Sequence, residues 1–428
     1  MTPSLVRSVP RVAGIALASM AILGLGTFYW GFVEAQALSA RPDNPRRIAF
    51  DRRIRRGAIL DRWGTVLAKT SFGDGLPARS YPIPWAAPVT GYQTWRYGAG
   101  LGGASYGSGG AEAAYDAALR GDLGLSPREL LATRLLHRPQ TGRDVRLTLD
   151  AALQAAAAEA LSPREGAVVV IDVDTGAIRA LVSLPTFDPA ALDAGTYPTD
   201  DPEKRMFNRA TQGRYPPGST WKTVTLAGAL QAGLVDLDTM VDDGAAIETF
   251  DGYQVACGNN PAGVTRFDIA HAYAWSCNVT FARLATALGP EEFRRLARAF
   301  GVDEAPPFPL AVTPGVVSVD PGLPPPELAA AGFGQGELLA TPLHMALVAA
   351  AMARGGVVPV PHLLAEVQGL PGAAAREAHG NWRGGGGAAV APFVDRGFAV
   401  AAVTTALPLV LERPLSEPPR IPLGLRVR

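Results

Sequence analysis

The segment 215–222, with the sequence YPPGSTWK, sets a serine and a lysine three residues apart where a helix can begin. Its two prolines and Gly218 end the preceding extended stretch, so we expect the helix to start near Ser219. Residues three apart lie on one face of a helix, which brings the Lys222 amine within reach of the Ser219 hydroxyl. The start of a helix also favours negative charge. An acylated serine needs a neighbouring base and donors for its oxyanion, and this segment predicts both.

Lysine is rare in this chain. Lysine and arginine together number 39, but the lysines are only Lys69, Lys204 and Lys222. Arginine stays protonated, whereas a partly buried lysine can release its proton and act as a base. This composition favours a chemical role for Lys222. The alternative is an ordinary helix start with a solvated lysine, because a Ser-x-x-Lys spacing arises easily by chance.

A second motif, Ser276-Cys277-Asn278, lies later in the chain. A Ser-x-Asn triplet in a short loop presents a hydroxyl and an amide side by side. The hydroxyl can pass a proton to a leaving amine, and the amide can hold a peptide carbonyl. Such triplets are common in turns. A Ser-x-Asn that follows a Ser-x-x-Lys, however, is the combination found in penicillin-binding proteins and class A β-lactamases.

The chain resembles the class B penicillin-binding proteins, which are monofunctional peptidoglycan D,D-transpeptidases, and especially their actinobacterial elongation and sporulation members. The resemblance extends over nearly the whole chain. It is carried by segments 56–64, 87–92, 114–116, 145–150, 168–172, 185–189, 334–336 and 341–343. It implies an α+β fold with a serine transpeptidase/β-lactamase-like domain on an N-terminal pedestal, preceded by a single transmembrane anchor.

The resemblance also implies the chemistry of the site. Ser219 would attack the carbonyl between two D-alanines of a peptidoglycan stem peptide, with Lys222 as the base. Ser276 would pass a proton to the departing D-alanine, and Asn278 would position the donor peptide. β-Lactams mimic this substrate, so they are expected to acylate Ser219. No cofactor is required.

The third motif of the family, Lys-Thr-Gly, is absent, because no lysine follows Lys222. In active relatives it helps to bind the carboxylate of the donor, and its strand supplies an oxyanion N–H. By order along the chain its place falls near Arg383, Gly384 and Gly385, where arginine could keep the positive charge but the threonine hydroxyl would be lost. The alternative is that 383–387 is a flexible loop. The C-terminus is therefore expected to be atypical, through divergence, truncation or a frameshift.

Two other functions stay open. The missing third motif is consistent with a catalytically impaired scaffold for a polytopic cell-wall glycosyltransferase, a partner that is also expected for an active enzyme. Domains with a Ser-x-x-Lys motif also serve as β-lactam sensors or hydrolases, but the pedestal segment 56–64 argues against that role.

Residues 12–33 carry no charge and are long enough to span a bilayer as a helix. Basic residues lie on both sides of the span, so the positive-inside count is nearly undecided, and the resemblance favours a cytoplasmic tail at 1–11. The expected divisions outside the cytoplasm are a pedestal of the dimerisation type at 40–150 and a transpeptidase domain at 151–428. The alternative to a single-pass anchor in the cell membrane is a signal peptide cleaved near 35–37.

Cys257 and Cys277 are the cysteines of this chain, and a domain outside the cytoplasm faces an oxidising compartment. A disulfide between them would tie a substrate-side loop to the second motif, and similar pairs occur among related sequences. Two unpaired thiols are the alternative, because a sequence does not give the geometry of the pair.

Charge and histidine spacing argue against other classes of function. The net charge is +0 at pH 7, which gives no support for nucleic-acid binding. The five histidines lack the spacing of metal ligands, and no phosphate-binding loop or dinucleotide motif is present. We therefore expect neither a metal site nor a bound cofactor.

Local patterns place the main elements of the expected transpeptidase domain. Asp150 begins an alanine-rich helix that runs to Leu161. Two alternating stretches around an Asp-Thr-Gly turn predict a hairpin. The hairpin strands are expected at 168–171 and 178–182, and further helices at 221–230, 280–288 and 341–352.

Overall fold

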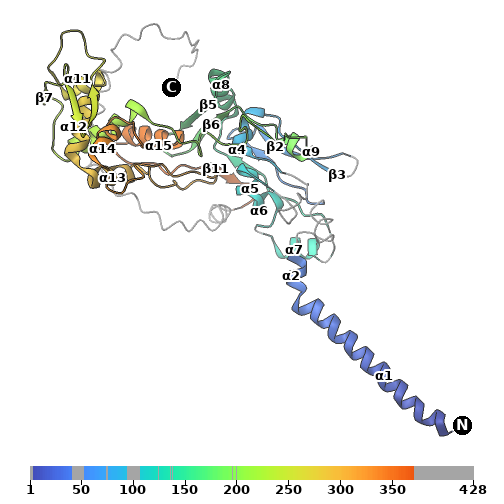
Figure 1. Ribbon diagram of the computed structural model, residues 1–428. Coiled ribbons are helices and arrows are strands. Elements are labelled where there is room, and N and C mark those ends of the chain that lie inside the picture. The colour runs from blue at the N-terminus through green and yellow to red at the C-terminus, as the bar shows by residue number, and fades with distance from the viewer. Residues whose placement is uncertain are drawn as a thin grey trace.

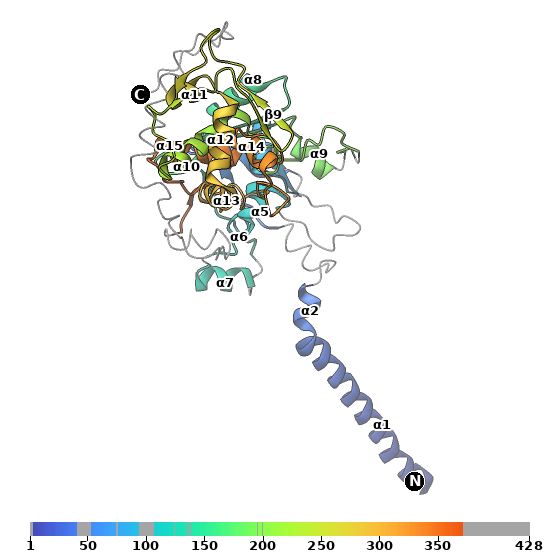
Figure 2. The ribbon, with the colours of Figure 1, turned by 60° about the vertical axis from the view of Figure 1, so that its left-hand side comes forward.

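The computed structural model describes residues 3–40, 53–73, 76–93, 107–123, 125–134, 136, 138–194, 196–198 and 200–370. The place expected for the third motif, Arg383, Gly384 and Gly385, lies outside these residues. In the described part, helices and short β-sheets pack together, and a long N-terminal helix extends away from them (Figures 1 and 2). This is the α+β class predicted from the sequence.

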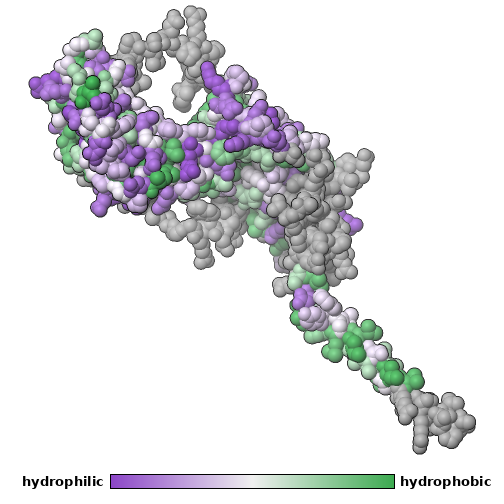
Figure 3. Space-filling model, viewed as in Figure 1, coloured by the Kyte–Doolittle hydropathy of each residue, from purple (hydrophilic) through white to green (hydrophobic). Residues whose placement is uncertain are grey.

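The N-terminal helix has the length and composition of a membrane span. α1 covers Pro3–Phe28, a π-helical turn continues it over Tyr29–Val33, and α2 follows at Ala35–Ala40. Val12–Val33 is an apolar stretch of 22 residues, none of it buried against the protein. Figure 3 shows green, apolar residues along this helix, whereas the coloured surface of the remaining molecule is mostly purple and white. A helix of this kind can cross a bilayer, at the position expected from the sequence.

A five-stranded sheet joins three distant parts of the chain. Its strands are β1 (Ile59–Leu60), β2 (Val66–Gly73), β3 (Leu76–Ser80), β4 (Val145–Leu147) and β11 (Leu364–Val367), in the order β11-β4-β1-β2-β3. β1 and β4 are parallel, and the other neighbours are antiparallel. Buried Leu147 pairs with Leu364 and buried Val145 with Val367. The sheet therefore links the expected pedestal to the expected transpeptidase domain.

Short helices follow the first three strands of this sheet, and a buried ion pair between Glu112 and Arg79 holds one of these helices to β3. They are a 3-10 turn at Pro84–Ala86, α4 (Ala87–Thr90), α5 (Gly110–Ala114), α6 (Asp116–Arg120) and α7 (Pro127–Arg134). The Glu112 carboxylate, which is 0 % exposed, accepts hydrogen bonds from Arg56 Nε and Arg79 Nε, both at 2.7 Å. Burial alone would raise the pKa of Glu112, but the two guanidinium groups lower it below its usual value.

The hairpin predicted after Asp150 is confirmed, and a helix packs against it. α8 spans Ala151–Leu161, β5 spans Gly166–Ile171 and β6 spans Ile178–Leu184, with α9 (Pro189–Ala194) following. The Asp150 carboxylate accepts hydrogen bonds from two backbone N–H groups in the first turn of α8, as an N-cap does. The Gln154 side chain joins helix to strand, since its Nε2 donates to Leu181 O at 2.8 Å and its Oε1 accepts from Leu181 N at 2.7 Å.

A second, helical core positions the site. Its elements are a 3-10 turn at Gly218–Trp221, α10 (Lys222–Gln231), α11 (Ile269–Ala274), α12 (Asn278–Leu288), α13 (Pro290–Ala299), α14 (Pro325–Gly332) and α15 (Pro342–Ala353). α12 packs against both α10 and α14 (Figure 2), and their apolar side chains, including Trp221 and Phe281, are buried together. The helices predicted at 221–230, 280–288 and 341–352 are confirmed.

Four short strands lie between α10 and α11. They are β7 (Met240–Val241), β8 (Ile247–Phe250), β9 (Tyr253–Ala256) and β10 (Phe267–Asp268). β7 pairs with β10 and β8 pairs with β9, both antiparallel. Asp268, the last residue of β10, directly precedes α11, and its side chain caps that helix. This segment therefore returns the chain to the helical core just before the second motif.

Candidate active site

Ser219 lies in the 3-10 turn that leads into α10, and it is exposed. The turn begins at Gly218, whose φ of +60° is in the left-handed region that favours glycine. Tyr215 and Ala340 exchange two backbone hydrogen bonds, of 2.9 and 3.0 Å, just before this turn. Gly218 N then donates to Gly334 O at 2.9 Å. These bonds hold the segment that delivers Ser219 to the first turn of the helix.

Lys222 is the first residue of α10 and is buried, with 1 % of its surface exposed. The oxygens within hydrogen-bond distance of its Nζ are Asn278 Oδ1 and Ser276 Oγ, both at 2.7 Å, Ser276 O at 2.9 Å and Ser219 Oγ at 3.1 Å. Burial lowers the pKa of Lys222 to about 8, because removal from water disfavours the ammonium form. A much larger fraction of Lys222 is therefore neutral near pH 7 than of a solvated lysine.

Ser276 lies in the turn between α11 and α12 with a φ of +59°, which is uncommon for a residue other than glycine. Backbone hydrogen bonds hold it there. Ser276 N donates to Tyr273 O at 3.1 Å, and Cys277 N donates to Ala272 O at 2.9 Å. In this position Ser276 Oγ donates to Ser219 Oγ at 2.9 Å. Backbone strain of this kind persists only where the surrounding structure supports it.

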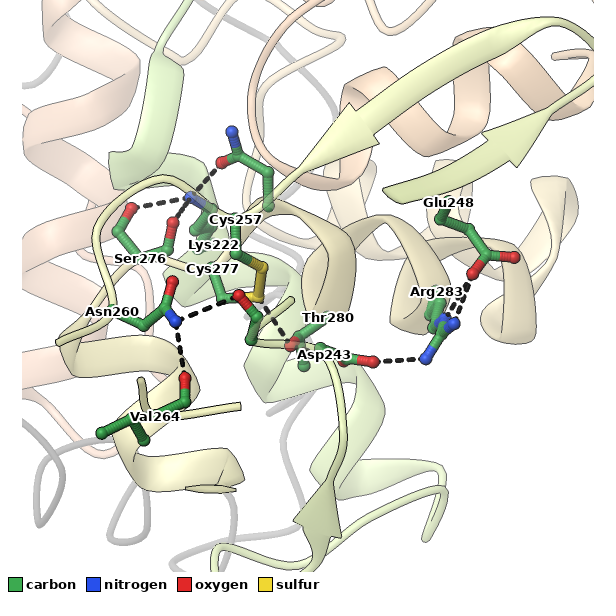
Figure 4. Close-up of a disulfide and its surroundings, with 12 residues drawn as sticks. Lys222, Asp243, Glu248, Cys257, Asn260, Val264, Ser276, Cys277, Thr280 and Arg283 are labelled. Atoms are coloured by element: carbon green, nitrogen blue, oxygen red, sulfur yellow. Dashed lines mark hydrogen bonds and ion pairs between the residues drawn. A yellow bond between two sulfur atoms is a disulfide. The ribbon is translucent and has the colours of Figure 1, made fainter. Parts of the chain in front are cut away.

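A disulfide between Cys257 and Cys277 ties the loop after β9 to the second motif (Figure 4). The two Cα atoms are 4.6 Å apart. Beside the disulfide, Thr280 Oγ1 donates to the buried Asp243 carboxylate at 2.7 Å, and Arg283 forms an ion pair with the same carboxylate. These contacts attach the segment that contains β7 to β9 to the first turns of α12.

The structure brings together the four residues that the sequence singles out: Ser219, Lys222, Ser276 and Asn278. Two hydroxyls and one amine form a closed network, in which each hydroxyl is within hydrogen-bond distance of the amine and of the other hydroxyl. Such a network can move a proton from an attacking hydroxyl to a leaving group without a metal. Within the described residues, no group of three or more His, Cys, Asp or Glu side chains could hold a metal ion.

Comparisons with known proteins identify the family of this chain. A family model, the penicillin binding protein transpeptidase domain, matches residues 166–384 of this chain of 428 residues. The chain is 33% identical over 392 residues to the peptidoglycan D,D-transpeptidase PbpA of Mycolicibacterium smegmatis, covering 85% of this chain and 75% of that protein. The chain belongs to the penicillin-binding protein transpeptidase family.

Solved structures of penicillin-binding proteins share the fold. Penicillin-binding protein A from M. tuberculosis, in a ceftriaxone acyl-enzyme complex, matches with a TM-score of 0.64 and 32% identity over 74% of each chain. The D,D-transpeptidase domain of a peptidoglycan glycosyltransferase from Eggerthella lenta matches with a TM-score of 0.64 and 28% identity, covering 84% of this chain and 82% of that one. This penicillin-binding protein is thus of class B, a serine-type peptidoglycan D,D-transpeptidase.

The sequence does not reveal the aromatic surroundings of the amine. The rings of Phe281 and Phe333 lie 5.6 and 5.9 Å from Lys222 Nζ, one from α12 and one from the turn after α14. Both residues are buried, so they help to keep water from the amine, and this desolvation favours its neutral form. Their ring faces act in the opposite direction, because they attract the ammonium form. Their local sequence carries no signal for this role, because the contact depends on how three helices pack.

Removal of the disulfide in this penicillin-binding protein is expected to destabilise the domain. The two cysteines are 20 residues apart, and a cross-link over a loop of this size stabilises a protein by about 3 kcal/mol. We expect Cys257→Ser to lower the free energy of unfolding by that amount, measured by chemical denaturation. A reducing agent should have the same effect on the wild type and none on the variant. A variant as stable as the oxidised wild type would contradict this expectation.

Proposed function

We propose that this transpeptidase cross-links peptidoglycan stem peptides through an acyl-enzyme formed on Ser219. The observation that carries the proposal is the buried amine of Lys222, 3.1 Å from Ser219 Oγ and 2.7 Å from Ser276 Oγ. Its pKa, lowered to about 8 by burial, makes it a base near neutral pH. The finding that relatives are peptidoglycan D,D-transpeptidases supports the choice of substrate.

In the first half-reaction, Ser219 Oγ attacks the carbonyl carbon of the peptide bond between two D-alanines, while neutral Lys222 takes the hydroxyl proton. The carbonyl oxygen becomes an oxyanion beside the Ser219 backbone N–H, in the first turn of the helix. The carbon–nitrogen bond then breaks, and Ser276 Oγ gives its proton to the departing amine. The Lys222 ammonium, 2.7 Å away, restores the Ser276 proton and becomes neutral again.

In the second half-reaction, an amine of a neighbouring stem peptide attacks the ester on Ser219. The amine loses a proton to the Ser276–Lys222 pair, and the leaving Ser219 oxygen receives one from Lys222. A new peptide bond forms and the free serine returns. Asn278 Oδ1 accepts a hydrogen bond from Lys222 Nζ at 2.7 Å. The NH₂ group of Asn278 therefore remains to donate to a carbonyl of the donor stem peptide.

β-Lactams are expected to acylate the same serine, because their strained amide imitates the D-alanyl-D-alanine end. A relative solved as a ceftriaxone acyl-enzyme complex supports this reading. The test uses the full-length protein in detergent with a fluorescent penicillin. We expect covalent label on the wild type and none on Ser219→Ala or Lys222→Ala. Lys69→Ala, which removes an exposed lysine on β2, serves as the matched control and should label fully.

A second candidate function is a scaffold for a polytopic cell-wall glycosyltransferase, with an impaired active site. The observation that favours it is the absence of any lysine after Lys222, and hence of a Lys-Thr-Gly motif. Labelling with the fluorescent penicillin distinguishes the active transpeptidase from the scaffold. No label on a folded wild-type protein, together with capture of the glycosyltransferase from the same membranes, would reject the active enzyme and support the scaffold.

The proposal places the protein in the cell membrane. Residues 12–33 form the single anchor, 1–11 the cytoplasmic tail, 40–150 the pedestal and 151–428 the extracytoplasmic transpeptidase domain. The support is the apolar stretch Val12–Val33, which is long enough to cross a bilayer. In this position the site faces the peptidoglycan, and the anchor can contact a polytopic glycosyltransferase partner.

A further inference from the structure

The turn that follows α14 touches the loop of the nucleophile through backbone alone. Gly334 has a φ of +80°, and a Cβ at this position would lie 2.0 Å from the carbonyl oxygen of Gly218. Gly218 N also donates to Gly334 O at 2.9 Å. Gly218 directly precedes Ser219, so this contact fixes the residue next to the nucleophile. A side chain at 334 cannot be accommodated unless one of the two backbones moves.

Two residues earlier, Gly332 touches α12, which begins in the second motif, and α10, which begins with Lys222. A Cβ on Gly332 would lie 2.5 Å from Phe281 O and 2.6 Å from Ala285 Cβ, both on α12. Gly332 O accepts a hydrogen bond from Thr225 Oγ1 at 2.8 Å, and Thr225 is on α10. α14 therefore reaches α12 and α10 at the same residue.

Phe333, between the two glycines, is buried. Its ring lies 5.9 Å from Lys222 Nζ, and the Phe281 ring lies 5.6 Å from the same atom. The three consecutive residues 332–334 thus contact the helix that carries the second motif, the amine of Lys222 and the loop before Ser219. The amine of Lys222 and the loop before Ser219 belong to the same segment, 215–222, whereas α12 begins at Asn278. Residues 332–334 thus connect the first motif to the helix of the second, beside the hydrogen bonds that Lys222 Nζ makes to both motifs.

We propose that the turn Gly332-Phe333-Gly334 is a positioning element for the transpeptidase reaction, and that it sets the distances among Ser219, Lys222 and Ser276. The proposal rests on the proposed acylation of Ser219. None of the three residues carries a group that reacts, although the Phe333 ring lies beside the Lys222 amine. They act by positioning neighbouring backbone segments. The absence of a side chain at Gly332 lets α12 pack close to the turn, the same absence at Gly334 lets the nucleophile loop pack close to it, and the Phe333 ring fills the space beside the Lys222 amine.

The test compares alanine at Gly334 with alanine at Gly301 in the full-length protein. Gly301 has a similar φ of +73°, but a Cβ there would meet nothing within 4 Å. Both variants place an alanine at a similar positive φ, and only Gly334→Ala brings its Cβ against the nucleophile loop. A displacement of about 1 Å at a reacting group can slow a reaction about 100-fold. We expect Gly334→Ala to show that loss in the acylation rate at saturating β-lactam, with an unchanged half-saturating concentration, and Gly301→Ala to keep the wild-type rate.

A third variant, Gly334→Asn, separates strain from contact. Asparagine tolerates the left-handed region better than other residues with a side chain, but it still carries a Cβ. We expect it to be as slow as Gly334→Ala. Recovery of the rate in Gly334→Asn, or equal losses in Gly334→Ala and Gly301→Ala, would overturn the proposal.

Hydrogen exchange at the Gly218 amide tests the turn independently of acylation. We expect fast exchange in Gly334→Ala and wild-type protection in Gly301→Ala. If the wild type takes no label, the proposed function fails, but hydrogen exchange still tests the role of the turn. Unchanged protection of the Gly218 amide in Gly334→Ala would then reject the proposal that the turn positions the nucleophile loop.

If Gly334→Ala does not fold, Phe333→Leu replaces it in the acylation test. We expect its rate at saturation to fall at least about 10-fold, and a wild-type rate would overturn the proposal.

Discussion

Replacement of Lys222 by arginine is expected to slow acylation of Ser219 about 100- to 10,000-fold, the range that a general base contributes. Arginine keeps a positive charge and several donors, but it does not release its proton. The loss combines removal of the base with the packing of a larger guanidinium group at a site where Lys222 is 1 % exposed. The measurement is the rate of covalent labelling by a fluorescent penicillin, with Lys69→Arg as the matched control on an exposed strand position. A Lys222→Arg variant that labels at the wild-type rate would exclude lysine as the base.

The same base predicts how acylation depends on pH. Burial lowers the pKa of Lys222 to about 8, so the amine is protonated below that pH and neutral above it. Because the neutral amine is the active form, we expect the wild-type rate to rise as pH increases through about 8 and then to level off. A rate that falls with increasing pH across the same range, in a protein that stays folded, would contradict the assignment.

Glu112→Gln is expected to destabilise the protein by about 3–5 kcal/mol, the usual effect of breaking a buried ion pair. Glu112 is 0 % exposed and is bonded at 2.7 Å to both Arg56 and Arg79, which are buried as well. The amide leaves these guanidinium groups with less counter-charge. The measurement is the free energy of unfolding from chemical denaturation. Glu292→Gln is the matched control, because the Glu292–Arg295 pair on α13 is half exposed, and its loss should cost less than about 1 kcal/mol.

The pH dependence of stability gives a second check on the network. The pKa of Glu112 is lower in the folded protein than its ordinary value of 4.5. The carboxylate therefore contributes its stability above the unfolded pKa, and this contribution is lost as pH falls through the folded pKa. We expect the wild type and Glu112→Gln to differ most near neutral pH and to converge in acid. A difference that grows as the pH falls would contradict the ion-pair account.

Part of the proposed site could be predicted from local spacing. Ser219 and Lys222 are one helical turn apart, so any helix that starts near Gly218 brings them together. Asp150 caps a helix because its side chain reaches N–H groups two and three residues ahead. The hairpin around the Asp-Thr-Gly turn and the apolar span at 12–33 follow from patterns of the same short range. Each of these features depends on residues close in sequence, so a sequence is enough to predict it.

The distances within the site were decided by tertiary structure. Ser276 approaches Lys222 from 54 residues away, and its left-handed backbone is held by a turn, a disulfide and the packing of α12. Phe333 reaches the amine, and Gly334 reaches Gly218, only because α14 packs against α12. The Glu112 network joins residues 33 and 56 positions apart in the chain. Local spacing carries no information about such contacts, because they depend on the burial of side chains from several elements at once. The sequence alone determined which groups we propose for the chemistry, and only the folded core decided how close they lie and how far burial lowers the pKa of Lys222.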